Sequence, residues 1–382
     1  MLSDFQLKDL TILRHYLHQH PEVSGQERQT ARVILKNLSP LRPDQIITDV
    51  GGHGIIATFD SGRPGLHLLF RAEIDALPIQ EVNTFDYASQ YPGVSHKCGH
   101  EGHSCILMGL AIWLCKHRPK SGKVSLLFQP AEETGAGAAA MLADPKMQDI
   151  QPDYVFALHN LPGHPLGEVL IRRGPITAAV RSMIIKLHGK TAHAAEPENG
   201  NNPSFVIANL LQEIQQFSNN DLSRADFKVI TPVHITVGEK AYGVAAGYGE
   251  LHLTIRSWSE EIMQDLIEEI MQEINQQCQL YDLKSSIEWT DAFLGNTNDD
   301  DAVDAVLEAT QQLDYPLRLL DYPLKWGEDF GYFTQRFLGA FFGLGAGKDC
   351  PALHNPDYDF PDALIEKGVE LFGRIIAHLL DD

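Results

Sequence analysis

The chain has few basic residues and no long hydrophobic run. Its 382 residues include 30 lysines and arginines against 51 aspartates and glutamates, which gives a formal net charge of −21. An acidic surface repels phosphate groups and no local basic cluster offsets it, so we expect neither nucleic acid nor an anionic membrane surface as a partner. The longest apolar run, "CILMGLAIWLC" at 105–115, is well short of the roughly 20 residues needed to cross a bilayer. The sequence therefore predicts no membrane-spanning segment.

Cysteine is also scarce, and its number is odd. The chain has five cysteines, and its first residues show neither the basic start and apolar core nor the small-residue cleavage site of a secretory signal. An odd number of cysteines in a long chain without such a signal favours reduced thiols over a disulfide framework. We therefore expect a soluble, intracellular protein of the cytoplasm.

Two familiar catalytic motifs are absent. The segment "HGKTAH" contains Gly-Lys-Thr, but a phosphate-binding loop requires glycine where Ile184 stands, and "GLGAGK" requires glycine where Lys348 stands. No Gly-x-Ser-x-Gly turn occurs in the sequence, so a serine-hydrolase mechanism lacks its nucleophile. These absences argue against a phosphate-loop nucleotide-binding protein and against a serine hydrolase.

The pattern of helices and strands indicates two domains. Helix-like and strand-like segments alternate over the first 175 residues, as a mainly parallel α/β sheet flanked by helices requires. From about residue 178 the order becomes strand, helix, strand, strand, helix, strand, which is that of a ferredoxin-like α+β unit. The α/β pattern returns after "LGNTNDDD" and ends in a C-terminal helix. The sequence therefore predicts a discontinuous mixed-sheet domain, residues 1–177 and 291–382, interrupted by an inserted α+β domain, residues 178–290.

The segment "HKCGHEGHSC", residues 96–105, concentrates histidine and cysteine. His100 and His103 are three residues apart, so they cannot form the helical pair of an HExxH zinc protease. Cys98 and His100, two apart and just before a helix, can converge on one ion, and thiolate with imidazole suits zinc and its divalent neighbours. The alternative, an ordinary polar loop, remains open on these residues alone.

Glu132 and Glu133 follow the apolar strand that ends at Gln129 in "LLFQPAEETGAG". Both carboxylates are therefore expected at the carboxyl edge of the sheet, where open α/β folds bind ligands. One of them can bind a metal ion while the other transfers protons. They can equally complement the N-terminus of the following helix without any catalytic role.

A Leu-His-Asn turn occurs twice, in "VFALHNLPG" and in "CPALHNPDYDF", and it places His159 and His354 at strand or loop ends. A single histidine in such a position is more often structural. Together with Cys98, His100 and Glu133, however, these histidines make a set of ligand-type groups from separate segments at one sheet edge. Two adjacent divalent ions require such a set.

A series of motifs along the chain has the same order as in one known family. They are "LRHYLHQHPEVSGQE", "RAEIDALP", "HKCGHEGH", "FQPAEETGAGA", "ALHNLPG", "GKTAHAAEP", "GEDFGYF" and "LHNPDYDF". Through these motifs the sequence resembles the M20 metallopeptidases, and in particular their aminoacylase and amidohydrolase branch, which includes hippurate-type and auxin-conjugate hydrolases. The resemblance runs nearly end to end. It implies a zinc-peptidase-like catalytic domain with an inserted lid or dimerisation domain.

The resemblance also implies the roles of individual side chains. Glu132 would be the general base, Asp75 would orient a ligand or tune the base, and His193 would reach the substrate carbonyl from the lid. Arg256 would help to hold the amino-acid part of the substrate. The cofactor would be two divalent ions per subunit, zinc, manganese, cobalt or nickel, since the ligand set does not fix the metal. Their ligands would be Cys98, His100, Glu133, His159 and His354.

Some positions depart from the pattern of the family. Glu73 and Glu101 stand where the branch has aspartate, which keeps the charge and lengthens the side chain. In "GVAAGYGELHLTIRSW", Gly243, Ala246 and Gly247 occupy the positions of the family's asparagine, proline and aspartate. In relatives the asparagine helps to hold the substrate, so its loss leaves recognition of the substrate carboxylate, and full activity, in question.

We expect the chain to hydrolyse the amide bond of a small N-acyl amino acid. Two alternatives stay open on the sequence: a dipeptidase or carboxypeptidase of the same superfamily, and a metal-binding or ligand-binding relative that has lost efficient catalysis. A homodimer through the inserted domain is a further expectation, because the apolar strands of that domain could pair across two copies.

Overall fold

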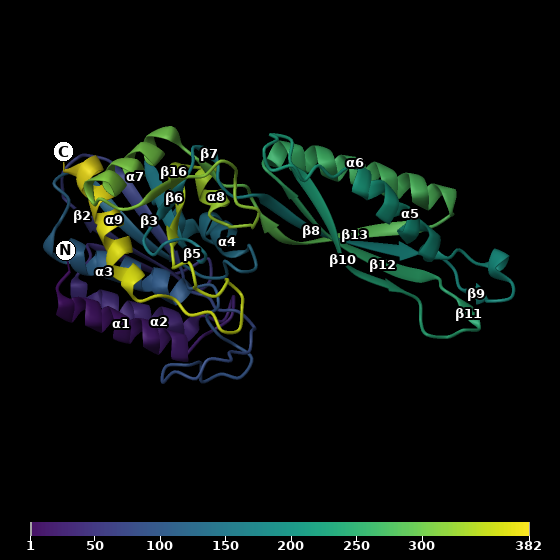
Figure 1. The fold of residues 1–382 in the computed structure, drawn as a ribbon, viewed down its shortest axis with the longest axis horizontal. Coiled ribbons are helices and arrows are strands. Elements are labelled where there is room, and N and C mark those ends of the chain that lie inside the picture. Colours follow the sequence, from purple (N-terminus) through teal and green to yellow (C-terminus); the bar gives the residue numbers. More distant parts are fainter. Residues whose placement is uncertain (1, 382) are drawn as a thin grey trace. The chain divides into compact units, whose positions relative to one another are not determined.

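The computed structural model describes residues 2–381, and the chain forms two compact units (Figure 1). The predicted discontinuous domain includes the residues directly after 321, whereas Tyr322–Glu328 belongs to the second unit. There the N–H of Ala178 donates to the carbonyl of Leu324 at 3.0 Å. The first unit comprises Met1–Ile176, Asn296–Asp321 and Asp329–Asp382, and the second comprises Thr177–Gly295 and Tyr322–Glu328.

The first unit is built on an eight-stranded mixed sheet with the strand order β1-β2-β4-β3-β5-β16-β6-β15. The central strands β4, β3, β5 and β16 run parallel to one another and are almost entirely buried, as expected for a sheet covered on both faces. This arrangement confirms the predicted mainly parallel α/β sheet. The strands of the sheet are β1 (Gln45–Val50), β2 (Gly54–Asp60), β3 (His67–Glu73), β4 (Lys123–Gln129), β5 (Tyr154–Leu161), β6 (Val169–Ile171), β15 (Leu317–Leu319) and β16 (Leu338–Gly345); β7 (Gly174–Pro175) pairs separately with β14 (Thr297–Asn298).

Helix α3 (His100–Lys116) carries the apolar run noted above and is buried over most of its length. It packs against α1, α9 and β3. Its approach to α9 is close, since a Cβ at Gly109 would lie 2.5 Å from Cγ2 of Val369. The run is therefore core, and no helix among residues 2–381 is long and apolar enough to cross a membrane. The other helices of this unit are α1 (Asp4–Gln19), α2 (Arg28–Leu38), α4 (Gly137–Ala143), α7 (Asp300–Gln312), α8 (Gly331–Thr334) and α9 (Ala363–Leu380), with 3-10 turns at Ser39–Leu41 and Pro145–Met147.

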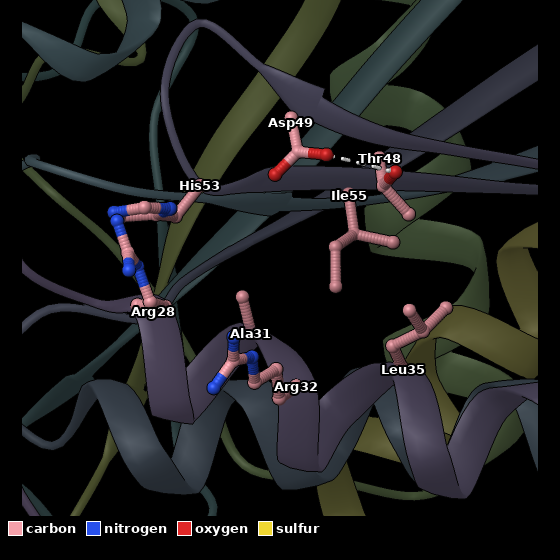
Figure 2. A pocket seen from close by; sticks show the side chains of 8 residues that line it. All are labelled: Arg28, Ala31, Arg32, Leu35, Thr48, Asp49, His53 and Ile55. Carbon is pink, nitrogen blue, oxygen red and sulfur yellow. Dashed lines mark hydrogen bonds between the residues drawn. The ribbon is translucent and has the colours of Figure 1, made fainter.

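A pocket of about 390 Å³ lies between α2 and the β1–β2 hairpin (Figure 2). None of the side chains predicted to bind metal lines it. The predicted ligands lie around the carboxyl ends of the central strands instead. The residues that line the pocket are Arg28, Ala31, Arg32, Leu35, Thr48, Asp49, His53 and Ile55.

The second unit has a four-stranded antiparallel sheet in the order β10-β12-β8-β13, with α5 and α6 on one face (Figure 1). Residues of β12 alternate between buried and more exposed positions, which is the period of a sheet with one face on a core. The order strand, helix, strand, strand, helix, strand is the one predicted from the sequence. The elements are β8 (Ala179–His188), β9 (Ala192–His193), a 3-10 turn (Pro197–Asn199), α5 (Pro203–Gln216), β10 (Lys228–Val237), β11 (Val244–Ala245), β12 (Tyr248–Ser257), α6 (Glu260–Leu280) and β13 (Lys284–Phe293).

Candidate metal centre

The side chains predicted as metal ligands come from four segments around the carboxyl ends of the central strands. His159 lies near the end of β5, and Glu133 follows the end of β4. Cys98 and His100 lie at the start of α3, and His354 lies between β16 and α9. Because the central strands are parallel, their carboxyl ends share one edge of the sheet.

Gly99 shapes the entry to α3. It has a φ of +92°, and a Cβ at this position would lie 2.5 Å from Oδ1 of Asn160. Only glycine combines a left-handed backbone with so close an approach. The glycine between Cys98 and His100 therefore allows the chain to bend so that both side chains reach the same region.

Cys98, His100 and His159 form one compact group. One ligand-type atom from each lies within 4.8 Å of the other two, and all three residues are buried. Sγ of Cys98 is 3.4 Å from Nε2 of His159. Atoms bound to one tetrahedral zinc at about 2.0–2.3 Å stand roughly 3.3–3.8 Å apart, so this spacing fits a shared ion.

Cys98 also belongs to a second group, with Glu133 and His354, that meets the same distance limit. Oε2 of Glu133 is 3.6 Å from Nε2 of His354, and its Oε1 is 3.8 Å from Nε2 of His100. The carboxylate thus lies between the two histidines. The structure brings all five predicted ligands together in two groups that share a thiol, whereas their role as ligands stays a prediction.

His100 is oriented by a carboxylate. Its Nδ1 lies 3.1 Å from Oδ1 of Asp75, while its Nε2 is buried without a hydrogen-bond partner in the described structure. Burial alone would lower the pKa of His100, but the hydrogen bond to Asp75 and the charges of Glu73, Asp75 and Glu133 raise it to about 10. A metal ion at Nε2 would replace that proton, and a carboxylate on the far nitrogen is a common support for a ligating histidine.

The other two members of the first group also fit a cation. Burial, followed by the charge of His103, lowers the pKa of His159 well below its ordinary value, so the imidazole is neutral. Its Nδ1 lies 2.9 Å from the carbonyl of Asn160, which directs Nε2 towards Cys98. Burial and the carboxylates of Glu133 and Glu132 raise the pKa of the Cys98 thiol, so the thiolate requires a positive charge beside it.

Two residues of the site have unusual backbone conformations. His354 has a φ of 66° and its N–H donates to the carbonyl of Lys97 at 2.7 Å, although 53% of its side chain is exposed. Ala131, directly before the two glutamates, has a φ of 52°. Non-glycine residues seldom adopt this conformation, and it often occurs at functional sites.

Glu132, the predicted general base, lies close to the same histidine as Glu133. Its Oε2 is 3.9 Å from Nε2 of His100, and the residue is 6% exposed. His100, Glu132 and Glu133 form a further compact group of ligand-type atoms. Both carboxylates can therefore reach the metal region, and the division of roles between them rests on the family pattern.

A buried polar network behind the site was not assigned a role from the sequence. His103 bonds to Glu73 at 2.8 Å and to Oδ1 of Asn160, the residue next to His159. Arg71 bonds in turn to Glu73 and to Asp329, and all these side chains are buried. The one signal in the sequence was a pair of charges inside the apolar strand "LLFRAEI".

His193 and Arg256 lie in the second unit. His193 is exposed on β9, where it pairs with Val244 of β11, and Arg256 of β12 donates to the carbonyl of Lys325 at 2.7 Å. Their roles towards a substrate therefore stay predictions.

Two of the departures from the family pattern, Ala246 and Gly247, are closely packed in the same unit, whereas a Cβ at Gly243 would meet no atom within 4 Å. A Cβ at Gly247 would lie 2.5 Å from the backbone nitrogen of Thr191, and one at Gly238 would lie 2.7 Å from the methyl group of Ala246. The carbonyl of Gly243 accepts the N–H of Ala194, one residue after His193. The ribbon that carries His193 is thus held by backbone hydrogen bonds.

Comparison with known proteins gives one consistent picture. The sequence profile of peptidase family M20/M25/M40 matches residues 69–378. An N-acetyl-L-cysteine deacetylase of Bacillus subtilis is 31% identical, over 98% of this chain and 89% of the relative. A hippurate hydrolase of Campylobacter jejuni is 27% identical, over 96% of each chain. A solved structure from Bacillus subtilis, described as a dinuclear metal binding peptidase of the M20 family, has a TM-score of 0.85 and 26% identity over 99% of both chains.

Proposed function

The chain belongs to the peptidase family M20/M25/M40, and from this membership we propose that it hydrolyses the amide bond of a small N-acyl amino acid with the help of two divalent ions. The observation that carries the proposal is the convergence of two groups of ligand-type side chains on Cys98. Zinc, manganese, cobalt and nickel all suit such a mixed set. The ions would be held by Cys98, His100, Glu133, His159 and His354.

Glu132 would transfer the proton. Bound at these residues, two divalent ions would supply the positive charge that lowers the pKa of a water molecule towards neutral pH. Glu132 would accept the proton as the water oxygen attacks the carbonyl carbon, and would pass it to the amide nitrogen as the C–N bond breaks. The products are the free carboxylic acid and the amine of the amino acid. His193 would donate a hydrogen bond to the carbonyl oxygen as negative charge develops there.

The relatives indicate the substrate class. Their names describe deacetylases of N-acetylcysteine and N-acetyldiaminopimelate and a hydrolase of hippurate, so an acetyl or benzoyl group on an amino acid is the first choice for this chain. Arg256 would bind the carboxylate of that amino acid through guanidinium N–H groups not used in its bond to Lys325.

We propose that the enzyme forms a homodimer through the second unit. Strand β10 is at one end of its sheet, and Val233 and Ile235 on this strand are 59% and 45% exposed. An edge strand with exposed apolar side chains is suited to pairing with a second copy. Sedimentation of the wild-type chain tests this: a monomer at all concentrations would contradict it.

The test of the activity is a hydrolysis assay with a panel of substrates. N-acetyl and N-benzoyl amino acids, and unblocked dipeptides, would be offered to chelator-treated protein before and after addition of each candidate metal. We expect amine release from the acylated substrates only with metal, and a Glu132→Gln variant should lose about 10²–10⁴-fold in kcat while it keeps its metal. Glu261→Gln, a surface change at the start of α6, is the control. Full turnover by Glu132→Gln, or turnover that survives metal removal, would contradict the proposal.

A further inference from the structure

The turn that carries both site glutamates is held in an uncommon conformation. It connects β4 with α4, and its left-handed residue, Ala131, directly precedes Glu132. The carbonyl of Ala131 accepts the N–H of Gly137 at 2.9 Å. A left-handed alanine is unfavourable by itself, so contacts from outside the turn have to stabilise it.

Two buried carboxylates bind the backbone on either side of Glu132. The N–H of Ala131 donates to Oε1 of Glu27 at 2.9 Å, and the N–H of Glu133 donates to Oδ2 of Asp75 at 3.0 Å. Glu27 and Asp75 are both fully buried. The residue predicted as the base is therefore bracketed by hydrogen bonds to its two neighbours in the chain.

Both carboxylates are held by the same N-terminal loop. The N–H of Gly25 donates to Oε1 of Glu27 at 2.7 Å, and the hydroxyl of Ser24 donates to Oδ2 of Asp75 at 2.7 Å. The loop and the turn are more than 100 residues apart in the sequence, since Glu27 and Ala131 are separated by 104 positions. Hydrogen bonds thus run from the loop through the two carboxylates to the turn, and together they support Glu132.

Glu27 does not act as an ordinary helix cap. It stands at the N-cap position of α2, but its side chain makes no capping hydrogen bond to that helix. Burial raises its pKa to about 7. A buried carboxyl group that makes no capping bond to its own helix indicates a use elsewhere.

We propose that Glu27 is a positioning residue for catalysis: by accepting the N–H of Ala131 it fixes the left-handed turn that aims Glu132 at the metal centre. The inference rests on the proposed function, because it concerns the base of that reaction. Without the acceptor, the partly buried N–H of Ala131 loses this hydrogen bond, and the turn is free to relax. A displacement of a catalytic group by about 1 Å can cost on the order of 10²-fold in rate.

The test compares three variants of the same loop. Glu27→Ala removes the acceptor, whereas Glu27→Gln keeps an amide oxygen that can accept the same N–H. Glu22→Ala is the matched control, since the carboxylate of Glu22 accepts the N–H groups of Gln29 and Thr30 at 2.7 and 2.8 Å instead of bonding to the turn. We expect Glu27→Ala to lower kcat by about 10- to 100-fold with KM and metal content unchanged. Glu27→Gln should recover most of that loss, and Glu22→Ala should keep the wild-type kcat.

Hydrogen exchange provides a readout that does not depend on turnover. The amide of Ala131 should exchange faster in Glu27→Ala than in the wild type or in Glu22→Ala. If Glu27→Ala does not fold, Glu27→Asp, which is one methylene shorter, should show the same loss of kcat and of protection.

Three results would overturn the inference: a kcat of Glu27→Ala equal to that of Glu22→Ala, an equal loss in the alanine and glutamine variants, or a loss of metal from Glu27→Ala. If the wild type hydrolyses none of the substrates, the proposed function fails instead. In that case unchanged exchange at Ala131 in Glu27→Ala would overturn the positioning role separately.

Discussion

The two units of this protein differ in what they bury. Within the described residues of the second unit, Glu328 is the one buried charged side chain, and the core is formed by aliphatic residues of the sheet and of α5 and α6. The first unit buries many charged groups beside an apolar core of its own. Examples are Arg14, Glu27, Arg71, Glu73, Asp75, Lys97, Glu101, Glu132 and Asp329.

Burying a charge costs free energy unless it is paired, so this difference is informative. In the first unit the buried charged groups form ion pairs with one another, and Asp75 bonds directly to the ligand-type side chain of His100. In the second unit the residues assigned to the substrate are not buried, and His193 is exposed. The first unit thus has an interior of paired polar groups, whereas the second unit has an apolar core and carries the residues assigned to the substrate outside it.

The largest loss of stability is expected from breaking the polar interior. Arg71 lies between Glu73 and Asp329, and all three side chains are fully buried. Arg71→Met removes the positive charge between two buried carboxylates, and we expect the free energy of unfolding to fall by about 3–5 kcal/mol. Urea unfolding measures this. Arg173→Met, which breaks an exposed pair with Asp304, should leave the free energy of unfolding almost unchanged. Both pairs belong to the first unit, so equal losses in the two variants would mean that burial of its charges does not set their contribution to stability.

A truncation in the apolar core of the second unit should cost slightly less and act locally. Ile270 of α6 is fully buried in that core. Ile270→Ala is expected to lower the free energy of unfolding by about 2–4 kcal/mol through lost burial and a cavity. Hydrogen exchange should increase in the second unit, while the metal content stays that of the wild type. Loss of metal from this variant would contradict the separation.

The charged interior of the first unit should also make its stability depend on pH. His18 lies 2.7 Å from Glu101 through Nδ1 and 3.0 Å from Glu81 through Nε2. Burial alone would lower the pKa of His18, but these hydrogen bonds raise it to about 9. Its stabilisation is therefore complete below the unfolded pKa of about 6.5 and is lost as the pH rises through 9, about 2 kcal/mol between pH 7 and 9.

His18→Gln isolates this contribution. Urea unfolding of the variant and of the wild type at pH 7, 8 and 9 should show a steeper decline in the wild type. Parallel declines would mean that His18 carries no such charge in the folded protein.

The smallest effect on stability is expected at the exposed histidine of the second unit. His193→Ala removes no buried group, so the free energy of unfolding should change by less than about 0.5 kcal/mol. Turnover should nevertheless fall by about 10²-fold if His193 donates to the developing oxyanion. His188→Ala, at another exposed histidine of this unit, should leave both quantities unchanged. Equal turnover in the two variants would exclude the proposed role of His193.

Local patterns in the sequence predicted the order and type of the main elements. Apolar runs bounded by Gly, Pro or Asn indicated the buried parallel strands, and the change of order after residue 178 indicated the second unit. The ligand-type residues could be listed because parallel strands place their carboxyl ends at one edge. The sequence did not place Tyr322–Glu328 with the second unit, because no local pattern shows the pairing of Leu324 with Thr177, far earlier in the chain.

The two Leu-His-Asn segments show that the same local pattern can adopt different conformations. Both are preceded by an apolar segment, yet His159 is 4% exposed inside β5, whereas His354 lies in a left-handed loop with half of its side chain exposed. The second conformation depends on the carbonyl of Lys97, far away in the sequence. The hydrogen bond between Glu27 and Ala131 likewise joins segments that are far apart in the sequence. No local pattern predicts a contact of this kind.

The most direct test of the account is the metal content of the wild type and of a variant at the thiol that joins the two ligand groups. After dialysis with a candidate metal, elemental analysis should find about two ions per chain in the wild type. Cys98→Ala should lose most of both ions, and Cys115→Ala, at an exposed cysteine, should lose neither. A wild-type chain that binds no ion, or a Cys98→Ala variant that binds as many as the wild type, would contradict the proposed metal centre.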